Sequence, residues 1–287
     1  RGFEHLDKSM LRRGKDSIAL VNTYVEEGEA FLIGKADKIV RNIAPQPEVC
    51  ARKTAHKDKT SSSCHSQWAP RCIGCHNSFE KNDPMAYYLL EKKVAESGWV
   101  EHVFEFSADL PALGVREKEG KRHIEPAVPG MILTIDHDSF EGDSLTGTAF
   151  KRLYAPNSPH TVGKGSRTCV SCHANPATIG YGKGKLEFDV SQNETEWVFT
   201  AEYAENPNDG LPEDAWIPFL EPPKAEVLST RSDFRPFGVD EQKRILTVGA
   251  CLKCHASDSP LMRRSLSSGI NPLLLERSAQ CVLPKFD

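Results

Sequence analysis

One five-residue pattern, Cys-x-x-Cys-His, occurs three times in this chain of 287 residues and constrains it more than any other feature. The copies span residues 72–76, 169–173 and 251–255. This spacing is the attachment signature of c-type haem, in which two thiols form thioethers with the porphyrin and the adjacent imidazole binds the iron. The pattern therefore predicts three covalent haems. Their thioether residues are Cys72, Cys75, Cys169, Cys172, Cys251 and Cys254, and their proximal iron ligands are His76, His173 and His255.

A fourth haem is predicted at Cys64-His65, which looks like the end of the same motif with Ser61 in the place of the first cysteine. Cys64 alone could hold that haem, with His65 as the proximal ligand, or Cys50 could supply a second thioether across a longer loop. The alternative is an ordinary Cys50–Cys64 disulfide, which an oxidising compartment permits. If Cys50 binds haem, Cys281 is the odd cysteine and is either free or paired with another chain. If Cys50 does not bind haem, a Cys50–Cys281 disulfide is the alternative.

The remaining histidines are candidates for the distal position on each iron, because a low-spin bis-histidine haem needs a second imidazole. His102 is a weaker candidate, since it is part of the alternating pattern of an expected strand. We expect His5 to be solvated. Met262 lies downstream of His255 and could cap the third haem through its thioether sulfur. The histidines that we expect to be distal ligands are His56, His123, His137 and His160.

Composition excludes two classes of function. A net charge of −4 provides no global basic field that would attract nucleic acid. No run of about 18 apolar residues is present, so we expect the chain not to span a membrane. The apolar share of 39% and the aromatic share of 8% are modest for a chain of this length. We therefore expect porphyrin to make up a large part of the core.

Local patterns predict two regions, an N-terminal helical segment over 1–48 and a multihaem domain over 49–287. Over 6–40, apolar residues are interleaved with charged ones, as is typical of amphipathic helices. We expect the multihaem domain to carry inserts at about 98–160 and 177–240, since both stretches lack cysteine.

Secondary structure is expected to be sparse. Strand-like alternation appears at 99–106 and 131–135, and a hairpin is expected around 196–201. A helix is expected over 240–252, with the third motif at its C-terminal end. The expected fold class is a multihaem cytochrome c of mostly irregular haem-wrapping loops, with several α-helices and a small β element.

Residues 64–76, which read CHSQWAPRCIGCH, resemble a segment of bacterial multihaem c-type cytochromes in which two haem motifs sit almost back to back. Ser61 departs from that group, which has a cysteine there. The resemblance implies a redox protein outside the cytoplasm with closely packed haems, although such motifs are weak indicators of biological role. It extends to residues 122–124, 129–132, 154–156, 159–161, 169–173 and 248–255.

The leading hypothesis is electron transfer through three to four closely packed haems c, mostly bis-histidine, without catalytic residues. Because covalent c-haem is assembled outside the cytoplasm, we expect a periplasmic or extracellular protein. Either the secretory signal has then been removed, or the chain is part of a longer one. The expected partners are redox proteins or further copies of this chain, and such copies could form a filament, a polymeric cytochrome wire.

The alternative is a multihaem oxidoreductase, or a subunit of one, that acts on a small nitrogen or sulfur compound at a five-coordinate haem. Such an enzyme needs an open iron with acid–base or anion-binding groups around it. The segment Lys121-Arg122-His123 could supply them, as could Lys164 and Arg167, but a solvated surface is the simpler interpretation of both. Because every motif supplies histidine to its iron, we favour the carrier.

Overall fold

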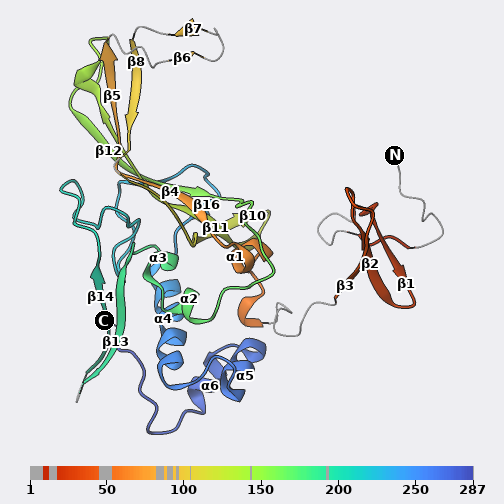
Figure 1. Cartoon of the computed structure of the whole chain (residues 1–287). Coiled ribbons are helices and arrows are strands. Elements are labelled where there is room, and N and C mark those ends of the chain that lie inside the picture. Colours follow the sequence, from red (N-terminus) through yellow and green to blue (C-terminus); the bar gives the residue numbers. More distant parts are fainter. Residues whose placement is uncertain are drawn as a thin grey trace. The chain divides into compact units, whose positions relative to one another are not determined.

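The structure is a computed structural model, shown in Figure 1. It describes residues 9–12, 18–44, 54–81, 87–88, 93–94, 97–103, 105–142, 144–191 and 194–286. The chain divides into two compact units, Arg1–Ala51 and Arg52–Asp287. Cys50 and His5 lie outside the described residues, so the predictions that involve them stay predictions.

The first unit contains an antiparallel three-stranded meander of β1 (Thr23–Glu26), β2 (Glu29–Ile33) and β3 (Val40–Ile43). Glu27 and Gly28 both have positive φ, which is the two-residue turn that best matches the twist of a hairpin. The aromatic rings of Tyr24 and Phe31, paired across β1 and β2, stack with centroids 5.1 Å apart. The helical segment expected over 1–48 is therefore wrong for these residues, since the Glu-Gly turn reverses the chain in the middle of it.

The second unit is built on a seven-stranded mixed sheet. Its long central strand, β11, pairs antiparallel with β10 and β12 and parallel with β5 (Figure 1). The sheet continues from β10 to β16, from β12 to β15 and from β5 to β8. The strands are β5 (Cys75–Lys81), β8 (Ser97–His102), β10 (Ala112–Lys118), β11 (Lys121–Asp136), β12 (Thr148–Pro156), β15 (Val227–Ser229) and β16 (Phe234–Arg235).

Three two-stranded pairs complete the β structure. The hairpin of β13 and β14 confirms the one expected around 196–201. The strands are β4 (Ala69–Ile73) with β9 (Glu105–Asp109), β13 (Gly184–Ser191) with β14 (Glu194–Ala201), and β6 (Tyr87–Tyr88) with β7 (Lys93–Val94).

The longer helices gather at the end of the sheet opposite β5 and β8 (Figure 1). The longest, α4 (Val239–Cys254), confirms the helix expected before the third motif. Among the described residues, no helix has the length and apolarity needed to cross a membrane. The others are η2 (Thr54–His56), α1 (Ser61–His65), η3 (His137–Ser139), α2 (Val170–His173), α3 (Pro176–Ile179), α5 (Pro260–Ser268) and α6 (Asn271–Leu275).

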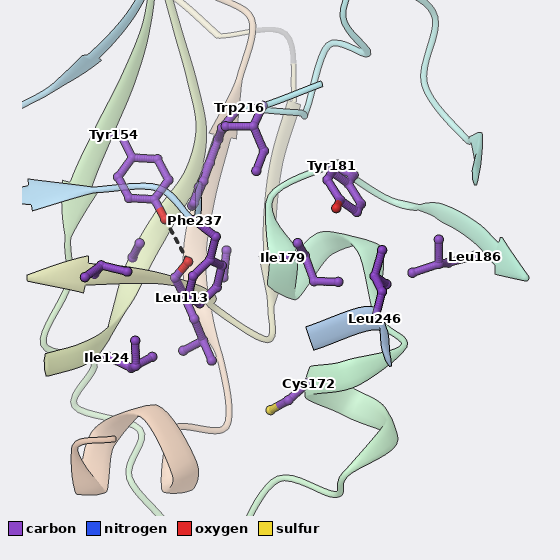
Figure 2. Packing of buried hydrophobic residues seen from close by; sticks show 14 of the residues in the cluster. Leu113, Ile124, Tyr154, Cys172, Ile179, Tyr181, Leu186, Trp216, Phe237 and Leu246 are labelled. Atoms are coloured by element: carbon purple, nitrogen blue, oxygen red, sulfur yellow. Dashed lines mark hydrogen bonds between the residues drawn. The ribbon is translucent and has the colours of Figure 1, made fainter. Parts of the chain in front are cut away.

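The core lies between the sheet, α3, α4 and the β13–β14 hairpin, and Figure 2 shows part of it. The rings of Tyr154 and Trp216 meet edge to face with centroids 4.0 Å apart, and both side chains are fully buried. The Tyr154 hydroxyl donates to the Leu113 carbonyl at 2.8 Å, which satisfies its one polar atom. Cys172 belongs to the same cluster, so one thiol of the second motif is part of the apolar core.

The expected fold class is wrong. Strands make up 38% of the structure and helices 20%, so the protein is not a set of irregular haem-wrapping loops with a small β element. The stretch 98–160, expected as an insert, supplies the central strands of the main sheet. Apolar residues of this stretch, among them Leu113, Val115 and Tyr154, pack in one core with residues of α3 and α4.

Candidate functional site

A cavity of about 270 Å³ lies beside the second motif. Its walls come from η2 and the loop after it, from β10 and β11, and from α2, α4 and α5. Apolar side chains form most of the lining, and three cations and two carboxylates are also present. The apolar residues include Leu113, Ile124, Phe237, Ile245, Val248 and Met262.

The second motif occupies one side of this cavity. Cys169 precedes α2 and His173 ends it, and the His173 amide donates to the Cys169 carbonyl at 2.9 Å. This single helical turn brings Cys169, Cys172 and His173 to the same cavity. In Figure 2 the Cys172 sulfur points away from Leu246, into the space beneath Leu113 and Ile124. The two thiols and the imidazole that the sequence assigns to one haem therefore share one space.

His56, at the end of η2, faces His173 across the cavity. The two ring centroids are 6.2 Å apart and the ring planes differ by 19°. Two imidazoles on opposite sides of one iron have centroids roughly 6 Å apart, because each metal–nitrogen bond is about 2 Å long. The pair thus has the spacing of two axial ligands. The sequence identified both residues but not that they belong together.

Backbone contacts set the tautomer of His173. Its Nδ1 lies 3.0 Å from the carbonyl oxygen of Ile245, on α4. A carbonyl only accepts, so Nδ1 carries the proton and Nε2 keeps its lone pair for a metal. This is the usual arrangement behind a metal-binding histidine.

Both imidazoles are held neutral. Burial lowers the pKa of His56 to about 3, and the charges of Lys59 and His173 add to the effect. Burial also lowers the pKa of His173 to about 4, again with help from Lys59. Metals bind the neutral imidazole, so both residues are in the ligating form at neutral pH.

The first complete motif has a different conformation. Cys72 lies on β4, Cys75 and His76 begin β5, and Gly74 between them has a φ of +68°. The Cys75 thiol donates to the Glu101 carboxylate. Burial, followed by this hydrogen bond, raises the pKa of Cys75 to about 12. The motif is therefore extended rather than a helical turn.

His76 faces His102 directly across β5 and β8. Their ring centroids are 6.4 Å apart, and His76 Nδ1 lies 2.9 Å from the Thr134 hydroxyl. His102 is half exposed, and its Nε2 lies 3.4 Å from the Ser78 hydroxyl. This second pair has a suitable spacing but is much less enclosed than the first.

The Cys64-His65 dipeptide lies in α1, whose first turn is capped by Thr60. Its helical form resembles that of the second motif, with Ser61 one turn before Cys64. His65 Nδ1 lies 3.2 Å from the Gly165 carbonyl, and the Arg167 amide donates to the Cys64 carbonyl at 2.8 Å. The loop that leads into the second motif therefore packs on α1.

The third motif forms the last turn of α4, with His255 as its C-cap. Cys251 is half-buried and Cys254 exposed. Burial raises the pKa of Cys251, and the Cys281 thiol adds to the effect. The described cysteines, Cys281 included, form no disulfide with one another. Met262, expected at the third motif, is instead buried in the cavity of the second.

Three expected distal ligands lie elsewhere. His123 is half-buried on β11 and pairs across the sheet with Arg116. His137 begins η3, and His160 is exposed in the loop after β12. Within the described residues, neither His123 nor His160 has its ring against that of a motif histidine. These assignments stay predictions.

Sequence reasoning did not identify the part that α4 plays in the cavity. Glu241, Arg244, Ile245 and Val248 all line it, and they follow the i, i+3, i+4, i+7 spacing of one helical face. That stripe was visible in the sequence. It could have indicated that the helix before the third motif also serves the second.

Comparisons with protein-family models, curated proteins and solved structures find no match for the chain. Within the described ranges, no group of three or more His, Cys, Asp or Glu is arranged to hold a metal ion. A haem iron takes four ligands from the porphyrin and needs only one or two from the protein. The residues around the cavity fit that requirement.

Proposed function

We propose that this chain holds a covalent c-type haem in the cavity beside α2 and acts as an electron carrier. The observation that carries the proposal is the facing pair of His56 and His173, with Cys169 and Cys172 lining the same cavity. The resemblance of residues 64–76 to bacterial multihaem c-type cytochromes supports the same cofactor.

Each of these residues then has a defined role. Cys169 and Cys172 would form the thioethers to the haem, and His173 and His56 would hold its iron. The Ile245 carbonyl holds the His173 ring in place. The apolar walls would pack against the porphyrin plate. When bound, the haem supplies an iron that can gain and lose one electron.

The two imidazoles favour a carrier over an enzyme. If His56 and His173 both held the iron, they would leave no open position for a substrate at this site. Rigid elements also join the motifs: α4 lines the cavity and ends in the third motif, and the loop before α2 packs on α1. We extend the proposal to haems at the other motifs, with redox proteins or copies of this chain as partners outside the cytoplasm.

The test is a His56→Ala variant of the haem-loaded protein. EPR of the oxidised protein should show one haem changed from low spin to high spin. The intact mass should show the same number of haems, since both thioethers remain. The matched control is Lys57→Ala, the exposed neighbour of His56 that does not line the cavity, which should leave the EPR spectrum unchanged. An unchanged spectrum for His56→Ala would overturn the ligand pair.

A further inference from the structure

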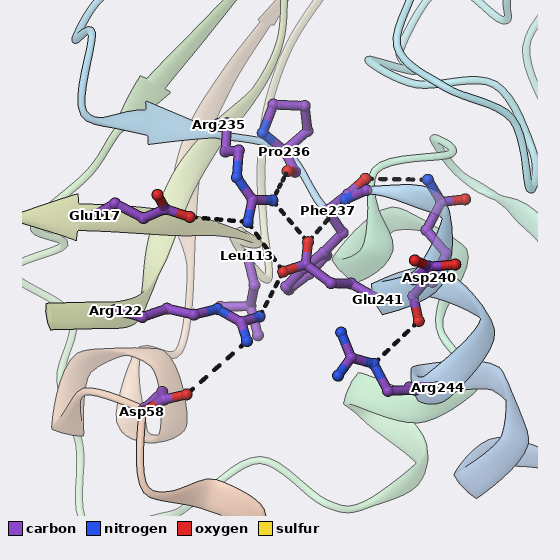
Figure 3. Close-up of polar contacts among 12 residues, drawn as sticks. Asp58, Leu113, Glu117, Arg122, Arg235, Pro236, Phe237, Asp240, Glu241 and Arg244 are labelled. Atoms are coloured by element: carbon purple, nitrogen blue, oxygen red, sulfur yellow. Dashed lines mark hydrogen bonds and ion pairs between the residues drawn. The ribbon is translucent and has the colours of Figure 1, made fainter. Parts of the chain in front are cut away.

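The cavity beside α2 carries more positive charge than its own acidic groups balance. Lys59, Arg122 and Arg244 line it, together with Asp58 and Glu241 (Figure 3). We infer that Arg122 and Arg244, with Lys59, bind the carboxylate groups of the ligand that fills the cavity. The inference rests on the proposed function, because haem has two propionates on one edge of an otherwise apolar plate.

Arg122, Arg235 and Glu117 form a charge-balanced network with Glu241, which therefore does not also neutralise Lys59 and Arg244. Arg235 donates to both of its oxygens, at 2.7 and 3.1 Å, and the Gly238 amide donates at 2.8 Å. Arg235 is not among the cavity residues. Burial opposes ionisation of Glu241, but these contacts and the charge of Arg122 outweigh it and lower its pKa. Glu241 is therefore ionised and holds Arg122 in position through an ion pair.

Arg122 is held in position but not fully satisfied. One terminal nitrogen donates to Glu241 at 2.6 Å, and the other lies 4.0 Å from Asp58, beyond hydrogen-bonding distance. Its Nε is buried and has no hydrogen-bond partner among the described residues. A buried donor without an acceptor is unfavourable. A carboxylate in the cavity would supply the missing acceptor.

Arg244 reaches the cavity from α4. Its Nε donates to the Asp240 carbonyl on the same helix at 3.1 Å, which directs the guanidinium toward Glu241 and Arg122 (Figure 3). Its terminal nitrogens donate no hydrogen bond to the described residues. Arginine presents paired N–H groups that match the two oxygens of a carboxylate. The cations therefore suit carboxylates on a ligand whose apolar body rests on Leu113, Ile124 and Phe237.

The test compares haem-loaded Arg122→Gln and Arg244→Gln with wild type by spectroelectrochemistry over a range of pH. Loss of a cation favours the more positive oxidised iron, so one midpoint potential should fall in each variant. The ionised propionates lose a stabilising positive charge, so their pKa should rise. The pH range over which the midpoint potential changes should therefore move to higher pH. Arg263→Gln, exposed on α5 and outside the cavity, is the control for net charge and should behave as wild type.

Three results would have different meanings. Potentials and pH profiles equal to wild type in both cavity variants would overturn the inference while leaving the haem site intact. Absence of haem from the peptide that carries Cys169 and Cys172 would instead overturn the proposed function. A further experiment adds sulfite or nitrite to the oxidised wild-type protein and to both variants. A spectral change that the two variants lose, with potentials unaltered, would assign the cations to a free anion and overturn the inference.

Discussion

Gly249 on α4 lies directly against His173 on α2. A Cβ on Gly249 would be 2.1 Å from the carbonyl oxygen of His173 and 3.1 Å from a ring carbon of Trp197. The second motif therefore packs backbone to backbone on the helix that carries the third. This close approach also brings the Ile245 carbonyl within hydrogen-bonding distance of the His173 ring.

Gly249→Ala should displace α2 from α4. Alanine is a better helix former by about 1 kcal/mol, but the clash with a backbone atom should outweigh this. We expect a net loss of about 1–2 kcal/mol in the free energy of unfolding. Chemical denaturation would measure it. In Gly238→Ala, at the start of the same helix, the nearest atom to the new Cβ is Glu241 Oε2 at 3.8 Å, so little clash is expected. Equal losses in both variants would contradict the packing argument.

His102→Ala tests the second histidine pair. If His102 and His76 share an iron, this variant should change one haem from low spin to high spin without changing the number of haems. The Ser78 and Glu80 side chains also lie near His102 Nε2, so Glu80→Gln serves as the control that disturbs the ring without removing it. An EPR spectrum of His102→Ala identical to wild type would show that His102 is a surface residue of β8.

Arg152→Ala should be among the most damaging changes to stability. The side chains of Arg152 and Asp209 are both fully buried and form an ion pair, and Arg152 also donates to the carbonyls of Leu211, Pro212 and Ala215. Removing one partner leaves a buried charge uncompensated, which costs about 3–5 kcal/mol. Thermal unfolding would report it.

The exposed Arg264–Glu276 pair provides the comparison for Arg152. Arg264→Ala should cost at most about 1 kcal/mol, because water screens an exposed pair. Similar melting temperatures for the two variants would show that the Arg152 network contributes little.

Asp109 should contribute to acid sensitivity. Burial opposes its ionisation, but hydrogen bonds from Lys183 and Ser107 and the charge of Arg71 outweigh it and lower the pKa of this carboxyl. Such a group stabilises the folded state above its unfolded pKa of about 3.9, and this contribution disappears as the pH falls through the folded value.

Asp109→Asn should therefore flatten the dependence of melting temperature on pH below about pH 4. Asp189→Asn, at an exposed position on β13, is the matched control and should retain the wild-type profile. The same slope in all three proteins would exclude a role for Asp109.

Several elements could be predicted because their signals are local. Helix α4 follows from the spacing of its apolar residues and the acidic residues in its first turn, and the β13–β14 hairpin from its alternation. The Glu27-Gly28 turn was an equally local signal that the helix interpretation overlooked. The main sheet was missed for a different reason, because the haem motifs led us to interpret 98–160 as an insert although its alternating pattern was visible.

The sequence by itself determined that the three groups of the second motif lie together, since Cys169, Cys172 and His173 fall within one helical turn. Only the tertiary structure decided that His56 faces His173 and that Met262 lies in the same cavity. These positions depend on the packing of α5 against η2 and of α4 against α2. In each case the two segments are far apart in the chain. Local periodicity can show which face of a helix is buried, but not which distant segment will cover it.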